Sequence, residues 1–296
     1  MKKVCPFCIP PSPRSDLGTK LIRHGSFFRK SDQAQLIRYK CLDCGKTFSQ
    51  ATGSLCYRQK KRHLNPHVFK FLASNISQRR LALTLGVNRK TIVRKFLFLS
   101  YYADLCFQQT RDDFYQNSPV MNMQFDDMET FEHSKLKPLS ITLAVENKTR
   151  RILGFRVSEM PAKGLLVQKS LKKYGKRQDE RRENRRSLFK ELGPFLSPGC
   201  IIESDENPHY RPCVEAFFPR SRHKAYKGRR GCVVGQGELK AGGYDPLFTL
   251  NHTCAMLRDN INRLVRRTWA TTKKKERLEL HIKIYALYHN LVLINK

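Results

Sequence analysis

The feature that most constrains this chain is a pair of C-x-x-C motifs near its start, separated by 32 residues. The first pair is Cys5 and Cys8, and the second is Cys41 and Cys44, followed directly by Gly45. Four thiolates brought together in this way satisfy the tetrahedral coordination of Zn²⁺. A segment this small cannot bury enough apolar surface to fold alone. We therefore expect residues 1–55 to form a zinc-stabilised module.

The charge of the chain points to a polyanionic partner. Lys and Arg number 57 against 25 Asp and Glu, which gives a net charge of +32 in 296 residues. Few metabolic enzymes tolerate such self-repulsion, and nucleic acid is the usual counterpart. No signal peptide pattern and no long apolar stretch is present, so we expect a cytoplasmic protein with no membrane partner. In a reducing compartment, cysteines favour metal binding over disulfides.

Residues 62–105 have the pattern of a helix-turn-helix. Ser77 and Asn88 are good N-caps for two successive helices, and Gly86 between them can end the first helix in a left-handed conformation. The residues expected to point outward from the second helix are Arg89, Lys90, Thr91, Arg94 and Lys95. This layout is typical of a recognition helix in the DNA major groove. The alternative is a helical hairpin with a solvated basic face.

Acidic residues are scarce, and several stand at the ends of strand patterns. The alternating stretch 120–127 ends in Asp126-Asp127, strands are expected at 139–145 and 151–157, and a buried strand at 199–205 ends in Asp205. With the intervening helical stretches, the expected order is β-β-β-α-β-α-β-α. The alternative role for each Asp is that of a strand-end cap.

Over nearly its whole length the chain resembles bacterial insertion-sequence transposases with a zinc ribbon, a helix-turn-helix and an RNase H-like catalytic domain. The resemblance rests on the two cysteine pairs, the helix pair at 77–96, the motifs around Asp126 and Asp205, and the stretch 251–267. It implies a multi-domain α/β fold with the catalytic domain at 118–296. It also implies metal-dependent cleavage and strand transfer at insertion-element ends, a homo-oligomer on double-stranded DNA, and a place at the bacterial nucleoid.

The resemblance also implies a catalytic set. The first two carboxylates match Asp126 and Asp205, with Asp127 as runner-up because a one-residue shift changes the sheet face. Relatives usually carry Glu at the third position, but here Asn251 stands in that register; Glu238 is the alternative. Such a set would hold two Mg²⁺ or Mn²⁺ ions for phosphodiester hydrolysis and transesterification.

Basic residues surround the expected site. Arg258 lies two helical turns after Asn251, where it could hold a DNA phosphate. A second basic cluster spans residues 222–230. Two competing functions remain at this level. An inactive DNA-binding relative acting as a regulator is favoured by Asn251, and a zinc-dependent RNA-binding protein is disfavoured by the helix-turn-helix.

Overall fold

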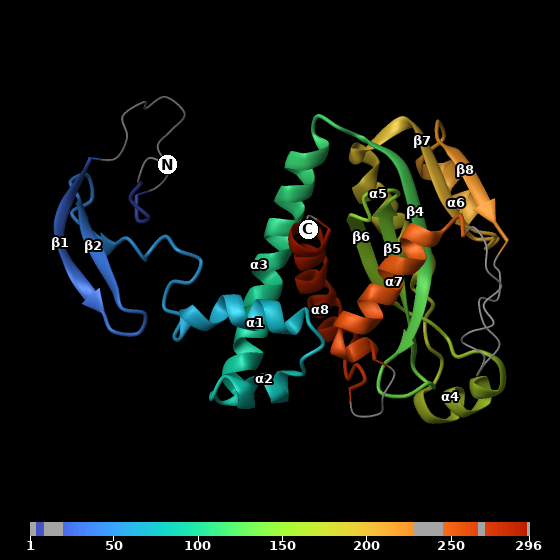
Figure 1. The fold of residues 1–296 in the computed structure, drawn as a ribbon, viewed down its shortest axis with the longest axis horizontal. Coiled ribbons are helices and arrows are strands. Elements are labelled where there is room, and N and C mark those ends of the chain that lie inside the picture. Colours follow the sequence, from blue (N-terminus) through green and yellow to red (C-terminus); the bar gives the residue numbers. More distant parts are fainter. Residues whose placement is uncertain (1–3, 9–19, 228–244, 266–269, 295–296) are drawn as a thin grey trace. The chain divides into compact units, whose positions relative to one another are not determined.

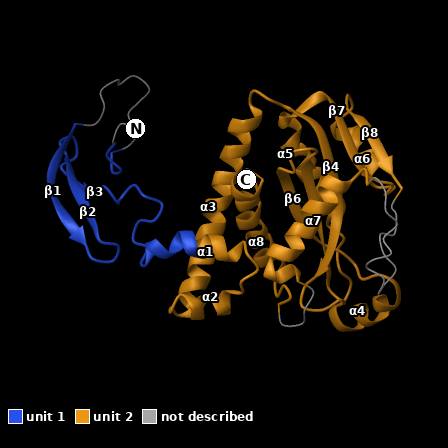
Figure 2. Cartoon of the chain, viewed as in Figure 1, with its two compact units in different colours: residues 1–67 blue, residues 68–296 orange. Residues whose placement is uncertain are grey.

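The computed structural model describes residues 4–8, 20–227, 245–265 and 270–294. The chain divides into two compact units, residues 1–67 and 68–296 (Figure 2). Glu238 and the basic residues Arg229, Arg230, Arg266 and Arg267 lie outside the described residues.

The first unit contains a small antiparallel sheet in the order β1-β2-β3. Its strands are β1 (Leu21–Arg29), β2 (Ala34–Cys41) and β3 (Thr47–Ser49). β1 changes register between Arg23 and Ser26, where Gly25 adopts a positive φ of 80°. β2 and β3 pair with each other, Tyr39 opposite Phe48, and the chain between them carries the second cysteine pair.

Three helices open the second unit or lie at its boundary. They are α1 (Asn65–Leu72), α2 (Gln78–Thr84) and α3 (Arg89–Tyr115). The expected caps are confirmed: the side chain of Ser77 accepts from the amide of Arg80, and that of Asn88 from the amide of Lys90. Gly86 takes a φ of 58° between α2 and α3, as a helix-ending glycine should.

α3 is longer than the recognition helix expected from the sequence. It has 27 residues and packs along α8 (Lys275–Tyr288), where the rings of Phe96 and His281 lie 5.7 Å apart. Near its end, Arg111 donates to the carbonyl of Leu153 at 3.2 Å. Helix and sheet therefore share one compact unit, because the buried face of α3 continues past residue 105, from Phe107 to Tyr115.

A mixed five-stranded sheet forms the centre of the second unit, in the order β6-β5-β4-β7-β8. Its strands are β4 (Val120–Phe131), β5 (Pro138–Glu146), β6 (Ile152–Glu159), β7 (Leu196–Asp205) and β8 (Arg222–Tyr226). The first three form an antiparallel meander, and β7 and β8 run parallel to β4. This mixed α/β architecture is compatible with an RNase H-like fold. The stretch 165–192 holds two helices instead of one, because Gly175, with a φ of 72°, ends the first.

Helices cover both faces of this sheet (Figure 1). The helices after β6 are α4 (Val167–Tyr174), α5 (Arg181–Leu192), α6 (Tyr210–Phe217) and α7 (Phe248–Asn260). α5 and α6 pack on one face, where the ring of Phe125 lies 5.0 Å from that of Phe189 and 4.8 Å from that of Tyr210. α7 crosses the other face, over β4 and β5. The main core thus lies between the sheet and α5.

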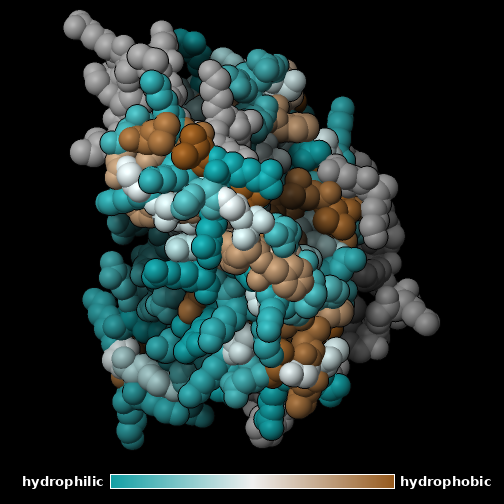
Figure 3. Space-filling model, turned by 90° about the vertical axis from the view of Figure 1, so that its left-hand side faces the viewer, coloured by the Kyte–Doolittle hydropathy of each residue, from teal (hydrophilic) through white to brown (hydrophobic). Residues whose placement is uncertain are grey.

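The face of the molecule that Figure 3 shows is predominantly polar. On the face that Figure 3 shows, hydrophilic side chains cover most of the described area, and apolar residues form small separate groups. Within the described ranges, no helix combines the length and the apolar character needed to span a bilayer.

Candidate active site

The two aspartates expected from the sequence come together at the end of β7. β4 and β7 pair in parallel with Gln124 opposite Glu203. Two residues further along, the same register places Asp126 beside Asp205 on the same face of the sheet. β7 ends at Asp205 while β4 continues to Phe131, so the pair stands at the C-terminal end of β7.

Asp126 is held firmly and is costly to ionise. Its Oδ1 accepts hydrogen bonds from the hydroxyl of Tyr210 at 2.9 Å and from the amide of Asp127 at 2.6 Å. Burial, followed by the negative charge of Asp205, raises the pKa of Asp126 to about 6. Burial also raises the pKa of Asp205, with a smaller contribution from Asp127. A half-buried pair of like charges of this kind is stabilised by a cation.

Asp127, the runner-up for the first position, faces the other side of β4. Its Oδ1 accepts from the hydroxyl of Thr142 at 2.5 Å, and its Oδ2 lies 3.9 Å from Nη1 of Arg185 on α5. The alternation of a strand separates it from the face on which Asp126 and Gln124 lie. The geometry therefore favours Asp126 as the partner of Asp205.

Asn251 lies in the first turn of α7 and is exposed. Its side-chain nitrogen donates to Oδ2 of Asp245 at 2.9 Å, which leaves Oδ1 as the atom able to ligate a cation. Cys254, one turn later, feels the charge of Asp126: burial and, to a smaller extent, that charge raise the pKa of its thiol to about 12. Asn251, Cys254 and Arg258 share one stripe of the helix by their spacing. Asp245 was not found by sequence reasoning.

A buried polar network joins the start of α7 to the sheet. Oε2 of Glu203 accepts from the side chains of Gln124 at 2.9 Å and Asn147 at 3.0 Å. Gln124 in turn accepts from the amide of Leu250, and Asn147 from the hydroxyl of Thr249, both at 3.0 Å. The sequence analysis missed this network. The signal was Gln124, a polar residue two places before Asp126 on a strand with a buried face.

The four N-terminal cysteines form one cluster in the first unit. Their Sγ atoms all lie within 4.8 Å of one another, with Cys5 3.7 Å from Cys44 and Cys8 3.6 Å from Cys41. A zinc–sulfur bond of about 2.3 Å in a tetrahedron implies sulfur–sulfur distances of about 3.8 Å, so the cluster could bind zinc. Burial opposes ionisation of Cys5, but amide hydrogen bonds from Phe7 and Cys8 lower the pKa of its thiol to about 7.

The expected DNA-facing residues of α3 differ in exposure. Arg89, Lys90 and Arg94 are exposed and Thr91 is half-buried. The prediction that Lys95 points outward is wrong, because only 2% of it is exposed. Lys95 lies three residues after Ile92, which places it on the buried face of the helix. On α7, Arg258 is exposed, as expected.

Comparison with known proteins gives little further guidance. No protein-family model matches the sequence, and no curated protein does either. Among solved structures, the catalytic domain of the Mos1 mariner transposase aligns over 69% of this chain and 95% of that one, with 12% identity and a TM-score of 0.22. A TM-score this low supports no assignment of fold or function, so the function must follow from the chain's own residues.

Proposed function

We propose that this chain is a DNA transposase that cleaves and joins DNA at the ends of an insertion element with divalent metal ions. The observation that carries the proposal is the Asp126–Asp205 pair on adjacent parallel strands, and α7, the helix that carries Asn251, packs on the same sheet. The pair is half-buried and electrostatically unfavourable without a cation, which is the expected condition of a metal site before loading.

Asp126, Asp205 and the Oδ1 of Asn251 are oxygen ligands, which suit Mg²⁺ or Mn²⁺. Two such ions would activate a water or a DNA 3′-hydroxyl and stabilise the departing oxygen. The chain's own contribution is orientation. Tyr210 and the amide of Asp127 fix the carboxylate of Asp126, and the network around Glu203 fixes the start of α7.

DNA would be bound at sites distinct from the carboxylates. Arg89, Lys90, Thr91 and Arg94 at the start of α3 are the residues proposed to enter the major groove. Arg258 would hold a backbone phosphate near the metal site. A homo-oligomer assembled on DNA remains part of the proposal. In the first unit we propose one structural Zn²⁺ bound by the four cysteines.

A second candidate function is that of a DNA-binding regulator derived from such an enzyme. Asn251 favours it, because an amide supplies no negative charge to a metal site that usually holds three carboxylates. The Asp126–Asp205 pair argues against it, because a chain that only binds DNA gains nothing from this unfavourable burial.

The two functions differ in one assay. Asp126→Ala and Asp205→Ala should each abolish nicking and strand transfer on a duplex carrying the element's end, while binding of that duplex is retained. Asp113→Ala, which changes an exposed aspartate on α3, is the matched control and should remain active. Binding without nicking by the wild-type protein in either Mg²⁺ or Mn²⁺ would establish the regulator instead.

The third ligand is tested separately. Asn251→Ala should lose cleavage, and Asn251→Asp should retain it because an oxygen remains at the same place. Loss of cleavage in Glu238→Ala, with Asn251→Ala active, would move the third position to Glu238 and leave the enzyme class intact.

A further inference from the structure

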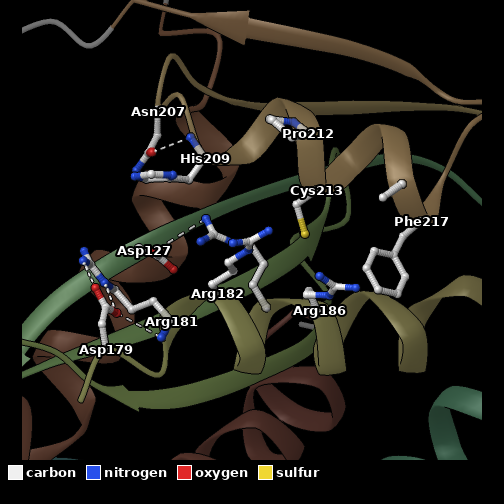
Figure 4. Close-up of a pocket in the computed structure, with 12 residues that line it drawn as sticks. Asp127, Asp179, Arg181, Arg182, Arg186, Asn207, His209, Pro212, Cys213 and Phe217 are labelled. Atoms are coloured by element: carbon white, nitrogen blue, oxygen red, sulfur yellow. Dashed lines mark hydrogen bonds and ion pairs between the residues drawn. The ribbon is translucent and has the colours of Figure 1, made fainter.

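A cavity of about 570 Å³ lies between α5 and α6, on the face of the sheet opposite α7. Its volume falls within the range of sites for small ligands. One wall comes from the arginine-rich first half of α5, and the other from α6 and the loop before it (Figure 4). The wall of α5 is formed by Arg181, Arg182, Arg185 and Arg186.

The cavity carries more positive than negative charge. Arg181 is already neutralised, since it makes a two-pronged contact with Asp179 at 2.9 and 2.5 Å. Among the described residues, no carboxylate lies within ion-pair distance of Arg182 or Arg186. These two guanidinium groups lie between the helices, near the α6 side chains Cys213 and Phe217 (Figure 4).

Arg185 is the strongest indication of a ligand. It is only 3% exposed, and its Nε and Nη1 donate no hydrogen bond to any described residue. Its nearest carboxylate oxygen, on Asp127, is 3.9 Å away, and the ring of Tyr210 lies 4.6 Å from the guanidinium carbon. A buried guanidinium with unused donors costs free energy unless an acceptor completes it. An anion in the cavity would supply that acceptor.

The part of the opposite wall formed by α6 is apolar, and the loop before α6, which contributes Asn207 and His209, leads to Asp205. Pro212, Cys213, Ala216 and Phe217 line the side formed by α6. Asn207 also lines the cavity, and its backbone N–H donates a hydrogen bond to Oδ1 of Asp205 at 3.1 Å. The ligand must therefore combine an anionic group with an uncharged, partly apolar body. A nucleotide has this composition, with its phosphate toward the arginines and its sugar or base toward α6.

We propose that the cavity between α5 and α6 binds one nucleotide, with its phosphate at Arg182, Arg185 and Arg186. The proposal rests on the proposed function only for where the nucleotide comes from. In a transposase the nucleotide belongs to a DNA strand that passes the metal site, whereas a free nucleotide would use the same contacts. Its existence as a site is independent of catalysis.

The test measures binding without Mg²⁺, so that loss of cleavage cannot affect it. A labelled single-stranded oligonucleotide is followed by fluorescence anisotropy, and thymidine monophosphate by calorimetry. Arg182→Gln and Arg186→Gln should each weaken binding about tenfold, the value of one charge-assisted hydrogen bond. Lys190→Gln on the same helix removes the same charge from an exposed residue outside the cavity, and should change affinity by about twofold or less.

A steric variant separates the cavity from general basic charge. Ala216→Trp fills the cavity without changing the charge and should abolish the same binding, whereas Ser187→Trp on the exposed side of α5 should not. If the cavity variants lose only oligonucleotide binding, the bound nucleotide belongs to a DNA strand. If they lose monophosphate binding, the site takes a free nucleotide. If neither ligand distinguishes Arg186→Gln from Lys190→Gln, and Ala216→Trp binds like wild type, the proposed site is refuted.

Discussion

Asp126→Asn should stabilise the metal-free protein near neutral pH. The ordinary pKa of an aspartate is 3.8, and burial together with the charge of Asp205 raises that of Asp126 to about 6. The difference corresponds to about 3 kcal/mol of unfavourable ionisation in the folded state. Asparagine removes that charge and keeps an oxygen for the hydrogen bonds from Tyr210 and the amide of Asp127.

The pH dependence gives the effect its signature. The folded protein keeps the Asp126 proton up to about pH 6, whereas the unfolded chain releases it near pH 3.8. The free energy of unfolding therefore falls as pH rises through this window, and the full cost is present at pH 7. Wild type and Asp126→Asn should differ by about 3 kcal/mol at pH 7 and become similar below pH 4.

Urea denaturation followed by circular dichroism measures this difference. The buffer should lack Mg²⁺ but contain no chelator, so that any zinc bound by the cysteine cluster remains in place. Adding Mg²⁺ should raise the stability of wild type and leave Asp126→Asn unchanged, because only wild type offers the carboxylate.

Asp127→Asn is the matched control, since it makes the same change one residue away. It removes the carboxylate beside the buried Arg185 and should destabilise the protein at pH 7. The reasoning about Asp126 is refuted if Asp126→Asn is less stable than wild type at pH 7, or if its advantage persists unchanged below pH 4.

Three further outcomes are expected. Purified protein should contain about one zinc ion per chain, and Cys41→Ser should release it and unfold the first unit, as metal analysis and circular dichroism would show. Arg89→Ala should weaken duplex binding without a change in the free energy of unfolding. Lys95 is buried, so Lys95→Ala should lower the free energy of unfolding by about 1–3 kcal/mol in urea denaturation. Glu203→Ala should cost about 2 kcal/mol or more and speed hydrogen exchange at the amide of Leu250 while leaving α8 protected.

Local signals in the sequence were sufficient for several of the element boundaries. Ser77 and Asn88 cap the helices that they were expected to cap, because their side chains satisfy amides within the same turn. The apolar run before Asp205 was likewise enough to place the end of β7, whereas β4 continues to Phe131, beyond the end expected at Asp126-Asp127. These signals act over a few residues, and the rest of the fold does not alter them.

What the sequence could not show depends on contacts between distant segments. The length of α3 follows from packing in the second unit, which no local pattern records. The network around Glu203 joins three distant segments. Glu203 lies 79 residues after Gln124 and 56 residues after Asn147. Each of the three is a common polar residue, so its identity alone does not indicate a role in the sequence. Only the fold gives them a shared role.

Asp126 and Asp127 illustrate how one strand can serve two opposite chemistries. Because successive side chains point to opposite faces, Asp126 meets a second carboxylate and Asp127 meets the arginines of α5. The environment of Asp126 favours binding of a cation, and the arginines beside Asp127 favour binding of an anion. The two environments lie on opposite sides of β4. In the proposed function, a metal-bound phosphodiester would lie on one side of β4 and a neighbouring nucleotide of the same strand on the other. A one-residue slip of β4 would move one aspartate into the place of the other and leave the second environment without its carboxylate, which makes the register of this strand the feature on which the proposed chemistry depends.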